Sequence, residues 1–163
     1  TRETLPREWA MTQYNLGSSL SYLPDGNRAA NLRTSIDCFK GALEVYTREV
    51  FTTDWAATQN NLGNAWQNLP DGDRASNLRE AIACYERAHR VYTREAFPDL
   101  HELVSKNLSW AQALLKDLGC GADSGRMYWR DNHGASPPLP SFCVMLFVHR
   151  AGSRAECTWL GVQ

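Results

Sequence analysis

The side chains most able to do covalent or metal chemistry are five cysteines, spaced widely and without a C-x-x-C pair. An odd count with wide gaps argues against a disulfide framework and against a zinc site, so we expect reduced thiols. His133-Gly134 and Cys143 form a conceivable Cys–His pair, but neither stands in a recognisable nucleophile context. We therefore favour a structural role for this pair, and also for Cys38 and Cys84, which occupy equivalent places in the repeat. The five cysteines are Cys38, Cys84, Cys120, Cys143 and Cys157.

Other motifs for catalysis are lacking in the sequence. It has no glycine-rich phosphate loop, no H-E-x-x-H and no paired-carboxylate motif, so we expect no enzyme activity, no cofactor and no metal. Lys+Arg number 17 against 18 for Asp+Glu in 163 residues, which predicts no nucleic-acid partner.

The longest apolar run, residues 144–148, is far shorter than the roughly 20 residues that cross a bilayer. The first residues show no signal peptide, so we expect a soluble, cytoplasmic protein without a membrane partner. Thr1 enters almost directly into a repeat without an initiator Met, which indicates an excerpt from a longer chain.

The elements that would position a binding site belong to an internal repeat of 46 residues. Residues 9–51 and 55–97 align without a gap and are identical at 25 of 43 positions. A weaker third copy follows residue 97, where Asn107-Leu108 and Ala111 keep the spacing. Self-similarity of this kind predicts a helical repeat array with a capping half-unit.

Each unit is predicted to form two helices. Leu32, Ile36, Phe39, Leu43 and Tyr46 advance by steps of four and three, which places them on one helical stripe. In both units, Pro-Asp-Gly supplies turn chemistry between the two predicted helices.

The predicted helix ends also carry capping signals. Asn27 and Asp73 suit N-caps of the second helices, Asp54 that of a first helix, and Pro6 a first turn. Gly17 and Gly63 lie inside helices, where glycine costs about 1 kcal/mol, so we expect close approach of the partner helix.

These residues resemble the tetratricopeptide repeat (TPR) family, whose first helix carries Leu-Gly and whose second carries small-x-x-x-aromatic-x-x-Ala. The matches are Leu16-Gly17 with Ser35, Phe39 and Ala42, then Leu62-Gly63 with Ala81, Tyr85 and Ala88. The unit is longer than the standard 34 residues and resembles arrays found in cyanobacterial and CHAT-associated multidomain proteins. The resemblance implies an all-α, right-handed superhelical solenoid of antiparallel helix hairpins.

The predicted domains follow from the repeat. Residues 1–118 would form the helical domain, with units about 5–51 and 52–97 and a capping half-unit at 98–118. Residues 119–163 form a non-repeat segment whose apolar runs, 142–148 and 157–160, predict a β-hairpin. This segment would cap the last hairpin, add a strand to another molecule, or begin a following domain.

By the same resemblance, ligands contact first-helix positions that line a concave groove. Amide side chains there can donate to and accept from a peptide backbone, although solvated polar residues on an exposed face are an equal alternative. Trp110 suits either an aromatic anchor or packing beneath the C-terminal segment. The predicted groove residues are Tyr14, Ser18, Tyr22, Asn60, Asn64, Gln67, Asn68, Lys106 and Trp110.

Two functions fit these features. The first is a protein–protein interaction module, a scaffold or adaptor that binds a peptide or protein segment in the groove without catalysis. The second is a structural repeat protein that forms end-to-end homo-oligomers or filaments through terminal hairpins and the C-terminal strand, because a heterologous contact that copies the internal one propagates.

Overall fold

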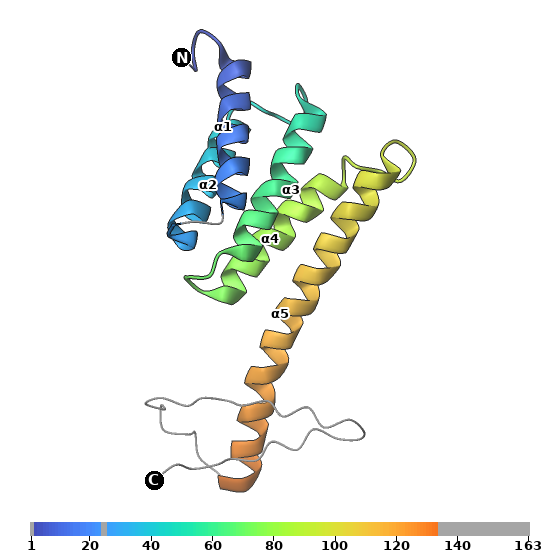
Figure 1. The fold of residues 1–163 in the computed structure, drawn as a ribbon. Helices are drawn as coiled ribbons and strands as arrows, with labels where there is room; N and C mark the ends of the chain where they lie inside the picture. The colour runs from blue at the N-terminus through green and yellow to red at the C-terminus, as the bar shows by residue number, and fades with distance from the viewer. Residues whose placement is uncertain (1, 24–25, 134–163) are drawn as a thin grey trace. The chain divides into compact units, whose positions relative to one another are not determined.

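The computed structural model describes residues 2–23 and 26–133, with side chains as far as Gly119. Over these residues the fold is all-α, as predicted, and consists of five helices (Figure 1). The predicted β-hairpin and Cys143 fall at residues 134–163, outside the described part. The helices are α1 (Pro6–Tyr22), α2 (Arg28–Leu43), α3 (Thr52–Asn68), α4 (Arg74–His89) and α5 (Pro98–His133).

The chain divides into two compact units, residues 1–124 and 125–163, and the features below belong to the first. α3 and α4 begin and end 46 residues after α1 and α2, so the sequence repeat is also a repeat of helix bounds. The predicted domain boundary at Leu118 falls inside α5, and it stays a prediction.

A side-chain N-cap fixes where the second helix of each hairpin begins. The side chains of Asn27 and Asp73 accept hydrogen bonds from the backbone N–H groups of Ala30, at 3.1 Å, and Ser76, at 2.8 Å. Each cap follows a turn glycine with positive φ, 85° at Gly26 and 77° at Gly72. Both predicted N-caps are therefore confirmed.

The first helices start differently from each other. Pro6 occupies the first turn of α1, as predicted. The prediction that Asp54 is an N-cap is wrong, because α3 begins at Thr52 with Phe51 as its N-cap and no side-chain capping bond. Asp54 instead lies in the first turn of α3, where its negative charge interacts favourably with the positive end of the helix dipole.

Helix packing follows the order of the chain. α1 packs on α2, α3 packs on α4, and α2 packs on α3, which joins the two hairpins. Leu32, Ile36 and Phe39 from α2 share a buried cluster with Leu62, and Leu43 packs against it, which confirms the predicted stripe as far as Leu43. Tyr46 lies beyond the end of α2 and packs in a separate cluster. The apolar face of α2 thus holds the second hairpin in place.

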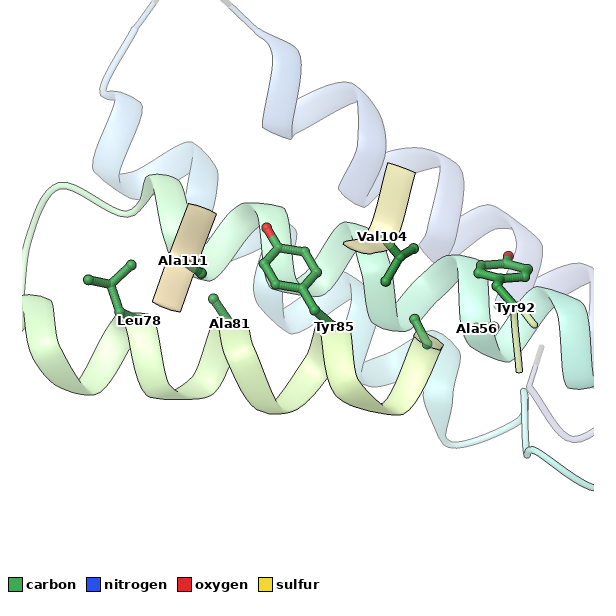
Figure 2. Close-up of a cluster of buried hydrophobic side chains, with 8 residues drawn as sticks. Ala56, Leu78, Ala81, Tyr85, Tyr92, Val104 and Ala111 are labelled. Atoms are coloured by element: carbon green, nitrogen blue, oxygen red, sulfur yellow. The ribbon is translucent and has the colours of Figure 1, made fainter. Parts of the chain in front are cut away.

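The first part of α5 covers the second hairpin. Figure 2 shows Leu78, Ala81 and Tyr85 of α4 in one buried cluster with Val104 and Ala111 of α5. All of these side chains are fully or almost fully removed from solvent. α4 therefore packs on both α3 and α5.

One glycine in each hairpin allows its two helices to pack closely. A Cβ placed on Gly63 would lie 2.6 Å from the Tyr85 ring, and one on Gly17 would lie 3.0 Å from the Phe39 ring. The close approach predicted for both glycines is confirmed, because a Cβ at Gly63 would overlap the Tyr85 ring and one at Gly17 would require a small shift of the Phe39 ring.

No helix among the described residues is both long and apolar enough to span a bilayer. Within the same residues, no three His, Cys, Asp or Glu side chains gather in a way that could hold a metal ion.

Candidate functional site

A hollow of about 120 Å³ lies between α1, α2 and α3 and brings together four of the nine predicted groove residues. These four are Ser18 and Tyr22 from α1 and Asn64 and Asn68 from α3. Two apolar α2 side chains, Leu32 and Phe39, also line it, together with Ser21, Arg28 and Asn61. The sequence analysis missed these five, because they do not follow the first-helix register that the resemblance supplied.

The α2 side of the hollow is fixed by hydrogen bonds to α1. Ser35, fully buried, donates through its hydroxyl to the backbone carbonyl of Gly17 at 2.7 Å, and its oxygen lies 2.6 Å from the Ser21 hydroxyl. Arg28 donates to the backbone carbonyl of Ser21 at 2.5 Å. The end of α1 is thereby bound to α2, and Arg28, the one charged side chain among the described lining residues, binds the carbonyl at that helix end.

Ser18 is the least satisfied polar group of the hollow. Its hydroxyl oxygen is buried and has no hydrogen-bond partner among the described residues. A buried hydroxyl without a partner costs free energy, roughly 1–3 kcal/mol by protein mutational data. Because the oxygen is out of reach of solvent, we expect this cost to fall on the stability of the fold.

Amide side chains of α3 form a hydrogen-bonded series with neighbouring helices. Asn61 donates to the Tyr14 hydroxyl of α1 at 3.0 Å, and Asn107 of α5 donates to the Asn60 side-chain oxygen at 3.0 Å. The Tyr85 hydroxyl of α4 donates to the Asn64 side-chain oxygen at 2.8 Å. This amide series, residues 14, 60, 61, 64, 85 and 107, links α1, α3, α4 and α5.

The amide series changes the expected role of three predicted groove residues. Tyr14 and Asn60 each accept a hydrogen bond from a neighbouring hairpin, and Gln67 accepts one from Tyr85 at 3.3 Å. None of the three lines the hollow, and Asn60 is only 8% exposed. Their geometry favours helix-to-helix contacts, which differs from both the ligand-binding and the solvated alternatives.

Asn64 and Asn68 keep capacity for a ligand. Asn64 uses its side-chain oxygen for Tyr85, and no hydrogen bond donated by its amide nitrogen is found within the described part of the chain. Asn68 is exposed, and its amide nitrogen donates to the backbone carbonyl of Asn64 at 2.8 Å. No donor to its side-chain oxygen is found among the described residues.

The two predicted residues of α5 do not line the hollow. Lys106 is exposed and forms an ion pair with Glu102 one turn earlier, at 2.5 Å. Trp110 is 64% exposed, and the C-terminal segment beneath which it was predicted to pack lies outside the described residues, so both alternatives stay predictions. Lys106 and Trp110 are thus both exposed on α5, away from the hollow.

A second hollow, of about 380 Å³, lies between α2 and the end of α3 and contains no predicted residue. Arg33 forms an ion pair with Asp71 there, and the Lys40 ammonium lies 5.1 Å from the centre of the Trp66 ring. Arg33, Asp71 and Lys40 thus have partners at this hollow, whereas Asp37, which also lines it, forms no ion pair with another described residue.

The two described cysteines are buried in the second helices, as predicted. Burial raises the pKa of the Cys84 thiol to about 11 and also raises that of Cys38. A thiol with a raised pKa contains little thiolate near neutral pH and is a weak nucleophile. Both side chains therefore act as small apolar groups of the core.

Comparison of the chain with protein-family models, with curated proteins and with solved structures finds no match.

Proposed function

We propose that the chain is a TPR-like helical-repeat adaptor whose first helices hold an extended peptide or protein segment. The observation that carries this proposal is the hollow between α1, α2 and α3, which gathers Ser18, Tyr22, Asn64 and Asn68. The finer fold, a right-handed superhelical solenoid, is part of the same proposal. It is supported by the identical spacing of the two hairpins and by α5, which packs on α4.

The chemistry of the hollow suits a peptide backbone with one apolar side chain. Amide groups of Asn64 and Asn68 in its lining can donate to and accept from peptide groups, and Leu32 and Phe39 are the apolar side chains of the lining. Its single cation, Arg28, already donates to a backbone carbonyl. We therefore propose a largely uncharged peptide segment, held without catalysis or cofactor.

Self-assembly through terminal hairpins is the weaker candidate. End-to-end growth by copying the internal contact requires a free apolar face on a second helix. Within the described residues, α3 covers that face of α2 and α5 covers that face of α4. A folded copy of the chain therefore offers no such face from its described part.

The test is selection of peptides from a random display library on the intact chain, followed by fluorescence anisotropy with a selected peptide. Asn68→Ala removes an exposed lining amide and should weaken binding at least several-fold. Gln112→Ala is the matched control, because it removes an exposed amide of α5 that does not line the hollow. Equal affinity of both variants and the parent chain would reject this hollow as the peptide site.

A further inference from the structure

Two leucines of the first repeat unit are exposed to solvent, whereas the equivalent leucines of the second unit are buried against α2. Leu16 is 46% exposed, whereas Leu62, its equivalent 46 residues later, is 4% exposed. Leu23 and its equivalent Leu69 differ in the same way, at 44% and 6%. The sequence of this outward face of α1 is therefore that of a buried helix contact, although nothing in the described chain covers it.

The internal contact shows which kind of surface complements these leucines. Leu62 and Leu69 lie in one buried cluster with Leu32, Ile36 and Phe39 of α2. Those three α2 residues form a stripe with steps of four and three, so the complementary surface is an amphipathic helix with bulky apolar residues.

A directional hydrogen bond accompanies the apolar contact. Asn61 and Asn107 occupy the same repeat position, and each donates to the residue 47 positions earlier, Tyr14 and Asn60 respectively. Asn15 is the equivalent residue of α1 and is exposed. Asn15 thus places a side-chain donor beside Leu16 on the outward face of α1. In the later units, the equivalent donors Asn61 and Asn107 bond to the hairpin that precedes them.

We infer that the α1 face formed by Asn15 and Leu16, with Leu23 at the C-terminal end of the helix, docks a helical hairpin of the α1–α2 type. The second helix of that partner carries the Leu-x-x-x-Ile-x-x-Phe stripe, and its first helix offers a hydrogen-bond acceptor to Asn15. A folded second copy is not the occupant, because its α2 and α4 stripes are already covered. This surface is separate from the hollow and does not depend on peptide binding there.

The inference is tested with an extended chain that carries one additional copy of residues 6–51 directly ahead of Pro6. Its junction, Phe51 followed by Pro6, has the same residue pair as Phe97-Pro98 at the start of α5. Leu16→Cys in the original α1 reports burial of the face through its rate of alkylation by iodoacetamide, read at that residue by mass spectrometry. Glu86→Cys on the exposed side of α4 is the control.

The extended chain should gain helical signal in proportion to its length, and alkylation of Leu16→Cys should slow at least ten-fold. Glu86→Cys should react equally in both chains. Ile36→Asp placed only in the added copy should restore fast alkylation, because it puts a charge into the docking stripe. An added copy that stays unfolded, or that folds without slowing alkylation, would overturn the inference. So would slow alkylation of Leu16→Cys in the parent chain that appears only as its concentration rises, because a second copy would then be the occupant.

Discussion

The side-chain nitrogen of Asn61 lies 3.0 Å from the Tyr14 hydroxyl oxygen, although the two residues belong to different hairpins. The same bond recurs one unit later, from Asn107 to Asn60, also at 3.0 Å. The asparagine of the Asn-Leu-Gly motif thus contributes to stacking of one hairpin on the next. Its recurrence at residues 15, 61 and 107 was visible in the sequence, but its partner was not.

Removal of this bond should lower stability. Asn61→Ala leaves the half-buried Tyr14 hydroxyl without its donor, and we expect the free energy of unfolding to fall by about 1 kcal/mol. Asn15→Ala is the matched control, because Asn15 is exposed at the equivalent position and should change stability by less than about 0.5 kcal/mol. Urea denaturation followed by circular dichroism measures both. Equal losses for the two variants would contradict an inter-hairpin role.

Gly63→Ala should destabilise the chain even though alanine is the better helix former. The new Cβ would lie 2.6 Å from the Tyr85 ring, and overpacking of this kind typically costs roughly 1–3 kcal/mol. Gly119→Ala in α5 is the control, because no atom lies within 4 Å of its Cβ position. There we expect no loss, or a gain of up to about 1 kcal/mol from helix propensity. Thermal unfolding of both variants decides, and a stable Gly63→Ala chain would contradict the close helix approach.

Alkaline pH should destabilise the fold through Cys84. Its thiol pKa is raised to about 11 by burial, from 9.0 in a model thiol, so the folded state keeps a proton that the unfolded state loses between these values. The free energy of unfolding should therefore fall as pH rises from 9 to 11, by about 2–3 kcal/mol in total from this group. Cys84→Ala should remove that part of the pH dependence, as measured by urea denaturation at several pH values. Identical profiles for both chains would argue against a protonated, buried thiol.

Ser18→Ala separates stability from binding. Its hydroxyl is buried without a partner, so alanine should leave stability unchanged or raise it by about 1 kcal/mol. Because the hydroxyl oxygen is out of reach of solvent, the same substitution should leave peptide binding unchanged. Thermal unfolding and anisotropy on one preparation measure both, and a several-fold loss of affinity would show that a ligand does reach this hydroxyl.

Features set by nearby residues were predictable from the sequence. The caps at Asn27 and Asp73 and the positive φ of Gly26 and Gly72 depend on two or three neighbouring residues. The prediction of Asp54 as an N-cap failed because Thr52 and Thr53 extend α3 toward the N-terminus. The residue at which α3 begins depends on the preceding turn. In that turn, the Phe51 N–H donates to the carbonyl of Thr47 at 2.9 Å.

The candidate site was only partly predictable, because its geometry depends on how the hairpins stack. Asn60 and Asn64 have the same residue type and lie one turn apart, but only Asn64 lines the hollow. Asn60 instead accepts a hydrogen bond from Asn107, which follows it by 47 residues. Helical register alone gives no distance between separate helices, so it could not distinguish the two.

The most direct test of the adaptor proposal locates a bound peptide. A peptide selected on the intact chain would carry a photoreactive benzophenone at its central residue, and mass spectrometry would identify the cross-linked residues. The proposal predicts cross-links to the lining of the hollow, chiefly Tyr22, Asn64 and Asn68, and their loss in excess unlabelled peptide. Cross-links confined to exposed residues outside the hollow, such as Asp37 of α2 and Glu86 of α4, would contradict it.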